Sequence, residues 1–376
     1  MIRKLKKYSI ILFLNIAKAL FSPFVKIDRS LVLFSSLNGA FTDNTKYLYL
    51  AMLKNKGFKA FYVAHDINTY NLLKKQNLPV IKIGFGMFFK AIKAKFFITT
   101  HNFQDVYYVK NKKTLVVNLW HGTPLKKMGF DTFIDAKKFY LKKKLGLFEH
   151  KYIDYLCVAS SYTINAFKSS FGLPTKKILP TGQPRNDLLF YCKQDPLLAL
   201  NIKESVKKKL GISAKKIALY APTFRDKHTC RVNLIRELQN IFTSHEIELI
   251  VKLHPLDKDI AYFKQPDIDI QELLIASDIL VSDYSSVFFD YSILERPIVL
   301  FLYDIEEYKD LRNGFYLDIE SLPFYKCYSL NEIKESLTNI FENYKKDEIG
   351  KFAQKFNRSG CASCRIIKFL QKIAKN

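Results

Sequence analysis

Four places in the sequence carry side chains that bind phosphate or move protons. Two are the histidines of a Trp-His-Gly-Thr and a Lys-Leu-His-Pro motif, His121 and His254. The third is Arg225, because a guanidinium can hold a phosphate through two hydrogen bonds. The fourth is the pair Ser285 and Ser286. Histidine can accept a proton from a hydroxyl near neutral pH, so the set suits chemistry on phosphates and hydroxyls.

The serine pair lies where a predicted strand gives way to a predicted helix. The apolar run 279–281 indicates a buried strand, and Ser282 and Asp283 end it. Free N–H groups at a helix start, together with serine hydroxyls, form an anion site. The same two serines could instead serve only as helix caps, which is a common role of Ser. These residues alone leave both interpretations open.

An alternation of strands and helices places the candidate residues. The sequence predicts strands at 31–34, 60–63, 80–83, 96–99, 114–119, 217–220, 248–253, 278–281 and 297–302. It predicts helices at 45–55, 67–76, 87–95, 132–150, 331–345 and 363–374. This pattern is typical of doubly wound α/β sheets, which bind ligands where their strands end. The mixed segment 187–213 is the expected junction of two domains.

Composition narrows the class of partner and the redox state. The chain has 376 residues, enough for two domains, and a formal net charge of +25. The charge favours an anionic partner, which could be nucleic acid, acidic lipid or a phosphorylated substrate. Six cysteines, mostly far apart, predict reduced thiols in a cytoplasmic protein. Cys361 and Cys364 form a C-x-x-C without a second pair, so we expect a structural role rather than a zinc site.

Two segments resemble membrane-surface helices. Residues 1–24 begin with basic residues and continue with an apolar run that Asn15 and Lys18 interrupt. The run is too short and too polar for a membrane span, and no signal cleavage site is evident. We expect a basic amphipathic helix on an anionic membrane, with a packed first helix as the alternative. Residues 132–150 mix aromatic and apolar residues with lysines in a similar way.

Five motifs together resemble the CDP-glycerol:glycerophosphate glycerophosphotransferase family, which includes teichoic acid primases, polymerases and related capsule enzymes. In order, they are Trp120-His-Gly-Thr-Pro-Leu-Lys-Lys-Met-Gly129, Gly182-Gln-Pro-Arg-Asn-Asp187, Tyr220-Ala-Pro-Thr-Phe-Arg225, Lys252-Leu-His-Pro255 and Ser282-Asp-Tyr-Ser-Ser-Val-Phe-Phe-Asp-Tyr291. The resemblance covers roughly residues 30–370. It implies a GT-B fold, an α/β architecture of two Rossmann-like domains with a cleft between them. The implied domains are 25–190 for the acceptor, 191–345 for the CDP donor, and helices in 346–376 that return to the first domain.

The resemblance also implies a reaction and roles for the candidate residues. A CDP-alditol, most often CDP-glycerol, is the donor, and a hydroxyl of a lipid-linked acceptor attacks its β-phosphorus and releases CMP. The implied catalytic residues are His121 as base and His254 as a donor to phosphate. The implied donor-binding residues are Arg185, Arg225, Ser285, Ser286, Asp283 and Thr123. In the alternative, His121 binds phosphate and Asp43 is the base.

The family implies no tightly bound cofactor or metal, although a divalent cation stays open. Two D-x-D pairs, Asp257 with Asp259 and Asp267 with Asp269, could hold such a cation but are common by chance. The expected location is peripheral, on the cytoplasmic face of the cell membrane, with no nucleic acid partner. By its motifs we expect the chain to resemble the short members of the family, without the long extra domains of some polymerases. The motifs do not distinguish glycerol from ribitol donors.

Two other functions compete with this interpretation. One is a GT-B glycosyltransferase that uses a nucleotide sugar, which would need a similar fold and phosphate site. The other is a basic protein that only binds nucleic acid or membrane, with strong salt dependence and no turnover. The second does not explain why histidine and arginine recur at strand ends.

Overall fold

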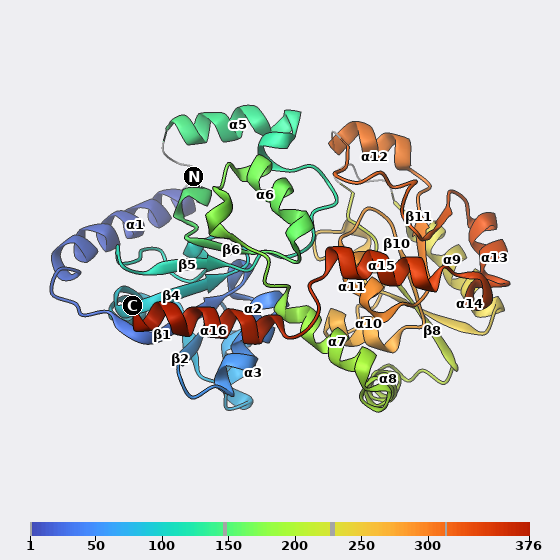
Figure 1. Ribbon diagram of the computed structural model, residues 1–376, viewed down its shortest axis with the longest axis horizontal. Coiled ribbons are helices and arrows are strands. Elements are labelled where there is room, and N and C mark those ends of the chain that lie inside the picture. Colours follow the sequence, from blue (N-terminus) through green and yellow to red (C-terminus); the bar gives the residue numbers. More distant parts are fainter. Residues whose placement is uncertain (1, 146–148, 226–229, 313) are drawn as a thin grey trace. The chain divides into compact units, whose positions relative to one another are not determined.

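The computed structural model describes residues 2–145, 149–225, 230–312 and 314–376 and divides into two compact units. Unit 1 contains Met1–His121, Phe139–Arg185 and Cys361–Asn376, and unit 2 contains Gly122–Lys138 and Asn186–Gly360. Figure 1 shows each unit as a sheet with helices on both faces. The predicted domain bounds differ from these units because residues 122–138 and 346–360 group with unit 2.

Unit 1 is built on a seven-stranded parallel sheet of order β3-β2-β1-β4-β5-β6-β7. Its strands are β1 (Asp28–Ser35), β2 (Lys59–Ala64), β3 (Val80–Lys82), β4 (Ala94–Thr99), β5 (Leu115–Asn118), β6 (Tyr155–Cys157) and β7 (Ile178–Leu179). The first five confirm the predicted strands. The last two are too short to give a hydrophobic pattern of their own. The order doubles back from β3 to β1 and continues through β4, the doubly wound arrangement that creates a binding edge.

Alternating side chains of unit 1's strands feed two cores. Val32 and Phe34 of β1 pack on one face with α2 (Asp43–Leu53), α3 (Ile67–Lys75) and α16 (Ala362–Lys375). Leu31 and Leu33 pack on the other face with α4 (Phe88–Lys93) and Leu14 of α1 (Ile2–Phe21). This is the period-two pattern of a strand buried on both sides. In Figure 1 the C-terminal α16 lies beside α2, and these two helices are in contact.

Unit 2 is built on a five-stranded parallel sheet of order β12-β11-β10-β8-β9. Its strands are β8 (Lys216–Tyr220), β9 (Ile247–Val251), β10 (Ile279–Ser282), β11 (Ile298–Phe301) and β12 (Tyr325–Cys327). Its helices are α7 (Asp187–Gln194), α8 (Pro196–Leu210), α9 (Val232–Ser244), α10 (Ile270–Ala276), α11 (Val287–Tyr291), α12 (Ile305–Arg312), α13 (Leu330–Leu337), α14 (Ile340–Asn343) and α15 (Lys346–Phe356). The predicted strands 217–220, 248–253, 278–281 and 297–302 are therefore confirmed.

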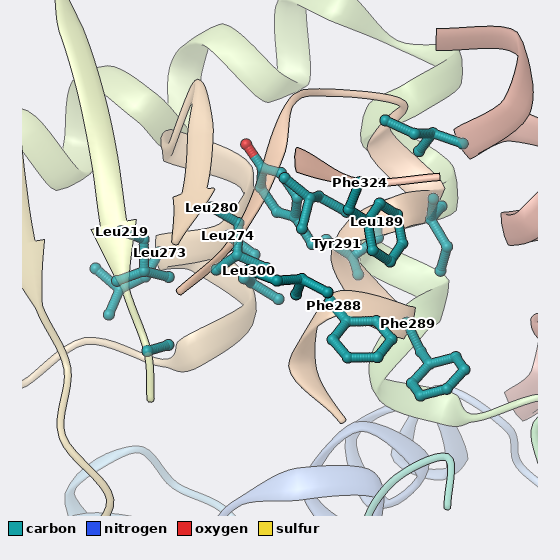
Figure 2. Close-up of a cluster of buried hydrophobic side chains, with 14 of the residues drawn as sticks. Leu189, Leu219, Leu273, Leu274, Leu280, Phe288, Phe289, Tyr291, Leu300 and Phe324 are labelled. Atoms are coloured by element: carbon teal, nitrogen blue, oxygen red, sulfur yellow. The ribbon is translucent and has the colours of Figure 1, made fainter. Parts of the chain in front are cut away.

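The larger core of unit 2 anchors the segment that carries the serine pair. Figure 2 shows Leu219, Leu280 and Leu300 of adjacent strands in the same buried cluster as Phe288 and Phe289 of α11. Burying each such side chain stabilises the fold by about 1.5–3 kcal/mol. The short α11 is therefore fixed by its aromatic side chains, and this fixes the polar turn that precedes it.

The predicted junction 187–213 is mostly helical and lies within unit 2, directly after the boundary at Arg185 and Asn186. Pro196 occupies the first turn of α8, where its missing N–H costs nothing. Asp195 caps the helix by accepting hydrogen bonds from the N–H groups of Leu197 and Leu198. Gly211 ends the helix at φ 71°. Pro196 of the expected junction is therefore a helix start.

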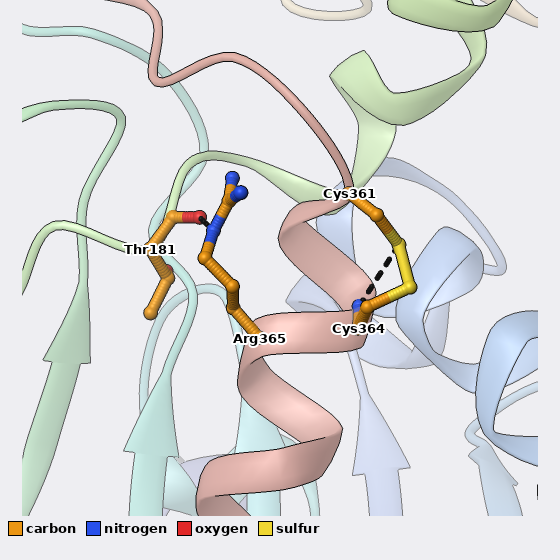
Figure 3. The surroundings of a disulfide bond; sticks show 4 residues. All are labelled: Thr181, Cys361, Cys364 and Arg365. Atoms are coloured by element: carbon orange, nitrogen blue, oxygen red, sulfur yellow. Dashed lines mark hydrogen bonds between the residues drawn. A yellow bond between two sulfur atoms is a disulfide. The ribbon is translucent and has the colours of Figure 1, made fainter.

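The expectation of six reduced thiols is wrong for one pair. Cys361 and Cys364 form a disulfide at the start of α16, shown in Figure 3. Cys361 is the N-cap residue, and residues three apart at a helix start lie on one side, so their Cα atoms are only 5.3 Å apart. Nearby, Arg365 Nε donates to the carbonyl of Thr181 at 2.7 Å. Cys157, Cys192, Cys230 and Cys327 are free.

The two predicted amphipathic segments form helices in the described part of the chain. α1 covers most of residues 1–24, and Leu14 is its buried contact with unit 1. α5 (Phe133–Lys144) covers the first part of 132–150, and residues 146–148 lie outside the described residues. Within the described ranges, no helix combines the length and the apolar character needed to cross a bilayer.

Candidate active site

The candidate site of unit 1 forms where two neighbouring strands end. Thr99 of β4 pairs in register with Asn118 of β5, and His101 and His121 follow these residues closely. Asn118 ties the two loops together: its Nδ2 donates to the carbonyl of His101, at 2.5 Å, and its Oδ1 accepts from the N–H of Trp120, at 2.7 Å. Trp120 has φ 52°, so the chain makes a left-handed turn that presents His121.

The imidazole of His121 is held between two rings. Trp120 stacks on it with a centroid distance of 4.4 Å, and His101 stacks on it at 4.2 Å with an interplanar angle of 5°. Its Nδ1 lies 3.2 Å from the carbonyl oxygen of Thr100. A carbonyl only accepts, so Nδ1 carries the proton and Nε2 has a lone pair. His121 therefore has the tautomer that a general base needs.

The electrostatic surroundings keep His121 neutral. Burial, followed by the neighbouring His101, lowers the pKa of His121 to about 4. The unliganded imidazole is therefore a weaker base than an ordinary histidine. Burial also lowers the pKa of His101 below its usual value. A nearby anionic substrate would raise both values, because an opposite charge favours the protonated form.

A cavity of about 260 Å³ opens beside this stack within unit 1. Its polar and aromatic lining residues are His101, Asn102, Phe103, Asp105, Trp120, His121, His150 and Tyr152. None of the described lining residues is lysine or arginine, although the chain as a whole is strongly basic. The cavity is at the small end of ligand pockets, which run from about 300 Å³ upward, so it suits one small polar unit.

Arg185, which the family resemblance implies as a donor-binding residue, contacts the loop of His121. Its Nη1 donates to Asp43 Oδ1 at 2.8 Å and to the carbonyl of His121 at 2.9 Å. Both side chains of this ion pair are largely buried. Asn44 braces the same turn by donating to the carbonyl of Trp120 at 3.0 Å. Asp43, the alternative base, is thus already engaged by a buried cation.

The candidate site of unit 2 also lies at the ends of adjacent strands. β10 pairs with β8 and β8 pairs with β9, so the residues that follow these strands share one edge of the sheet. Arg225 follows β8, His254 follows β9, and Asp283 with Ser285 follows β10. The phenyl ring of Phe224 lies against the His254 ring at a centroid distance of 4.9 Å and joins two of these loops.

His254 has the opposite hydrogen-bond arrangement to His121. The backbone N–H of Leu256 donates to its Nδ1 at 3.1 Å, so Nδ1 has the lone pair and Nε2 carries the proton. The side chain is exposed. Loss of surrounding water and the nearby Lys126 lower its pKa below the usual value. His254 can therefore donate a hydrogen bond to an anionic oxygen in its neutral form.

Arg225, which the sequence predicts to bind phosphate, is enclosed by carboxylates and tyrosines. It binds Asp304 through Nε at 2.6 Å and Asp283 through Nη2 at 2.9 Å. The rings of Tyr284 and Tyr308 lie 5.2 and 5.1 Å from its guanidinium carbon. Burial opposes the charge, but Asp283 and Asp304 outweigh it and raise the pKa of Arg225. The ion pair between Arg225 and Asp283 therefore stabilises the polar turn that precedes α11.

The serine pair lies half-buried just before α11. Ser285 Oγ accepts a long hydrogen bond of 3.4 Å from the N–H of Val287. Ser286 is the N-cap residue by position, but its side chain makes no capping hydrogen bond. Because α11 has only five residues, its dipole contributes little to anion binding. The hydroxyls and backbone N–H groups of the turn carry the anion-binding potential.

The remaining candidate residues fall in unit 2. Thr123 is buried, and its hydroxyl has no hydrogen-bond partner within the described ranges. Thr223 follows β8, and its buried hydroxyl also has no hydrogen-bond partner within the described ranges. Its backbone N–H donates to Asp283. Asp257 and Asp259 both bind the buried Arg231, so this D-x-D pair is a structural ion cluster. In the described part of the chain, no three His, Cys, Asp or Glu side chains are grouped to hold a metal.

Sequence reasoning missed His101, Thr100 and Asn118, which position the base. His101 follows the strand predicted at 96–99, so the strand-end rule that selected His121 would also have found it. The stacking of the two rings depends on the register of β4 with β5, which no local pattern gives.

Comparison with known proteins identifies the family. The family model of CDP-Glycerol:Poly(glycerophosphate) glycerophosphotransferase matches residues 17–372. The chain is 31% identical over 351 residues to a teichoic acid poly(glycerol phosphate) polymerase of Bacillus spizizenii, which covers 85% of this chain and 86% of that protein. It is 32% identical over 324 residues to a teichoic acid glycerol-phosphate primase of Bacillus subtilis, with 82% and 80% covered.

A solved structure shares the fold over the whole chain. The wall teichoic acid polymerase TagF superposes with a TM-score of 0.77 at 23% identity, and the match covers 100% of this chain and 98% of that chain. The fold is thus the α/β fold with parallel sheets of that polymerase. Since the family model and the relatives both span most of the sequence, the predicted resemblance is confirmed: the chain belongs to the CDP-glycerol:poly(glycerophosphate) glycerophosphotransferase family.

Proposed function

We propose that this transferase moves glycerol phosphate, or a related alditol phosphate, from a CDP-alditol to a hydroxyl of a lipid-linked acceptor and releases CMP. Family membership supports the reaction class and CDP-glycerol as the first donor to test. Its similar proteins include a glycerol-phosphate primase and a ribitol-phosphate polymerase, TarL of Staphylococcus aureus, which is 25% identical over 372 residues. The product would enter a teichoic-acid-like or capsular polymer.

The observation that carries this proposal is the pair of opposite histidine tautomers. His121 has its lone pair on Nε2, because Nδ1 donates to Thr100. His254 has its proton on Nε2, because Nδ1 accepts from Leu256. Phosphoryl transfer needs a group that takes the proton of the attacking hydroxyl and donors that stabilise charge on the phosphate oxygens. The two histidines fit these two needs.

In the proposed step, unit 1 supplies the base and binds the acceptor, and unit 2 binds the donor. The acceptor oxygen forms a bond to the β-phosphorus while its proton passes to His121 Nε2. The bond from the β-phosphorus to the bridging oxygen breaks, and CMP leaves with that electron pair. His254 Nε2–H and the hydroxyls of Ser285 and Ser286 donate to the diphosphate. A two-domain GT-B organisation remains part of this proposal.

Substrate binding would also activate His121. Its pKa of about 4 makes the unliganded imidazole a weak base. A diphosphate brought near it would favour the imidazolium form and raise that pKa toward the working pH. The Arg185–Asp43 ion pair keeps the His121 loop fixed while this happens. The base would therefore be strong only when the donor is bound.

We also propose peripheral attachment to the cytoplasmic face of an anionic membrane. α1 packs through Leu14 but leaves large apolar side chains exposed, with Leu12 64%, Phe13 59% and Leu20 63% accessible. Phe85 continues this face, in contact with Phe13 at a centroid distance of 6.1 Å. The high positive charge of the chain favours acidic lipid as the occupant.

The direct test of function is CMP release from a panel of CDP-alditols and CDP-sugars, with and without a lipid-linked acceptor. The proposal expects CMP release with CDP-glycerol or CDP-ribitol and a product that contains the donor phosphorus. Release of CMP without phosphorus in the product, or turnover only with nucleoside diphosphate sugars, would support a glycosyltransferase instead. Parallel assays with EDTA and with Mg²⁺ decide whether a divalent cation takes part.

Membrane attachment is tested by sedimentation with vesicles of phosphatidylglycerol or phosphatidylcholine. Phe13→Ser with Leu20→Ser should release the protein from phosphatidylglycerol vesicles. Leu197→Ser, at an equally exposed apolar position of α8, is the matched control and should leave binding unchanged. Equal binding of all variants would contradict the assignment of this surface.

A further inference from the structure

Beyond the proposed roles of His121 and His254, a second imidazole of unit 1 has a specific geometry. His101 lies face to face with His121, with a centroid distance of 4.2 Å and planes within 5° of each other. Trp120 covers the opposite face of His121. The ring of His121 therefore cannot tilt, and only its edge can meet a substrate.

Thr100 orients both imidazoles at once. Its carbonyl accepts the hydrogen bond from His121 Nδ1, at 3.2 Å, and its hydroxyl lies 3.0 Å from His101 Nδ1. The hydroxyl of Ser36 lies 2.9 Å from that of Thr100 and extends the chain into the core, where both residues are buried. Asn118 adds a third tether by donating to the carbonyl of His101. One short network thus sets the positions of two rings.

We propose that His101 is a positioning residue that clamps His121 in the orientation required for proton transfer. The inference rests on the proposed function, because it assigns His121 as the base. A ring is needed at this position, because stacking requires a flat face that covers that of His121. His101 also lines the 260 Å³ cavity, so the clamp forms part of the wall that meets the acceptor.

A second consequence is electrostatic coupling. Two stacked imidazoles this close disfavour double protonation, because like charges repel. The other charged groups facing the pair are Asp43 of α2, Arg185 at the end of unit 1, and Asp105 of η3 (Phe103–Asp105). Asp43 and Asp105 favour protonation of the pair, and Arg185 opposes it. Replacing His101 by an uncharged residue should therefore make His121 easier to protonate.

The test uses the full chain and three variants. His101→Ala removes the ring, His101→Phe keeps a flat ring without charge, and His245→Ala removes an imidazole of α9's end as the matched control. CMP release from CDP-glycerol with acceptor should fall in kcat by about 10- to 100-fold for His101→Ala, in line with the cost of misplacing a catalytic group. The donor KM should stay within about twofold of the wild-type value, while His101→Phe should recover most of kcat.

A readout independent of turnover separates this inference from the proposed function. The ring signals of His121, assigned with His121→Gln, are titrated by NMR in the wild-type protein and both His101 variants. The pKa of His121 should rise in both variants. Wild-type kcat in His101→Ala, an unchanged pKa of His121, or a His101→Phe variant as slow as His101→Ala would overturn the positioning role. If His121→Gln itself keeps wild-type turnover, the proposed base is wrong, whatever the titration shows.

Discussion

The candidate sites of the two units are made from the same parts but are set for opposite tasks. Each has a histidine just beyond a parallel strand, and each has a largely enclosed arginine paired with aspartate. In unit 1, His121 is enclosed by rings and exposes a lone pair. In unit 2, His254 is exposed and presents an N–H.

The difference shows that a histidine's role depends on the atom that its other nitrogen meets. The carbonyl of Thr100 makes one imidazole an acceptor at Nε2, and the N–H of Leu256 makes the other a donor. Each contact comes from a backbone atom of the loops at the strand ends, so the conformation of those loops sets the tautomer of the histidine. Arg185 and Arg225 have a similar role in the unliganded structure, because each binds aspartate and stabilises a loop of its unit.

The largest expected effect is at the base. His121→Ala should lower kcat for CMP release by about 10²- to 10⁴-fold, the usual contribution of a general base, with little change in donor KM. Thermal melting should stay close to that of the wild type, since the side chain is at a cavity. A normal kcat in this variant would contradict the assignment of His121 as the base.

The buried arginine of unit 2 should matter for stability. Arg225→Ala leaves the buried Asp283 and the partly buried Asp304 without their cation, so the free energy of unfolding should fall by up to about 3–5 kcal/mol in urea titration. Lys59→Ala is the control, because it breaks an exposed pair with Asp28 that is worth about 0–1 kcal/mol. Equal losses in both variants would contradict the enclosing role of Asp283 and Asp304.

His254→Ala should act on donor binding more than on the chemical step. Losing a hydrogen bond to a charged oxygen costs about 1.5–3 kcal/mol, so the KM for CDP-glycerol should rise roughly 10- to 100-fold. Steady-state kinetics at saturating acceptor separates KM from kcat. If kcat falls as far as in His121→Ala while KM stays constant, His254 acts in the chemical step and the assigned division of roles fails.

The serine turn should give a smaller change of the same kind. In the double variant Ser285→Ala with Ser286→Ala, two neutral donors are lost, together worth at least about 1 kcal/mol, and the donor KM should rise by about fivefold or more. Ser336→Ala, on α13 of the same unit, serves as the control. An unchanged KM would mean that the diphosphate binds elsewhere in unit 2.

The pH profile should show the smallest effect near neutrality. Because the pKa of His121 is lowered to about 4, the unliganded base stays deprotonated at neutral pH, and kcat/KM should fall only as the pH drops toward that value. The acid limb of kcat itself should lie at higher pH, since bound donor raises the pKa. Coincident limbs would show that the donor does not act on His121.

The sequence predicted the repeating elements well because their signal is local. The strands at 31–34, 96–99 and 279–281 are apolar runs buried on both faces, and their length and flanking polar residues identify them. β7, with two residues, has too few side chains for any pattern. The expected junction at 187–213 begins close to the boundary between the units at Arg185 and Asn186, but its helices α7 and α8 were not predicted, because Pro196 at a helix start resembles a proline in a linker.

The candidate site was predicted in its residue types but not in its contacts. The motifs supplied His121, His254 and Arg225. The partner that encloses Arg225 is Asp304, 79 residues away, and only the order of the strands brings the two together. His101 escaped notice because its importance depends on the register between β4 and β5. Motif residues such as Asn186 and Asp290 bind one another within unit 2.

The most direct test of the account is the tautomer of each histidine, read from the ¹⁵N shifts of its ring nitrogens at neutral pH. We predict that His121 carries its proton on Nδ1 and that His254 carries it on Nε2. Assignment by His121→Gln and His254→Gln makes the result unambiguous. The same tautomer at both positions, or a protonated His121 in the unliganded protein, would contradict the proposed division into base and donor.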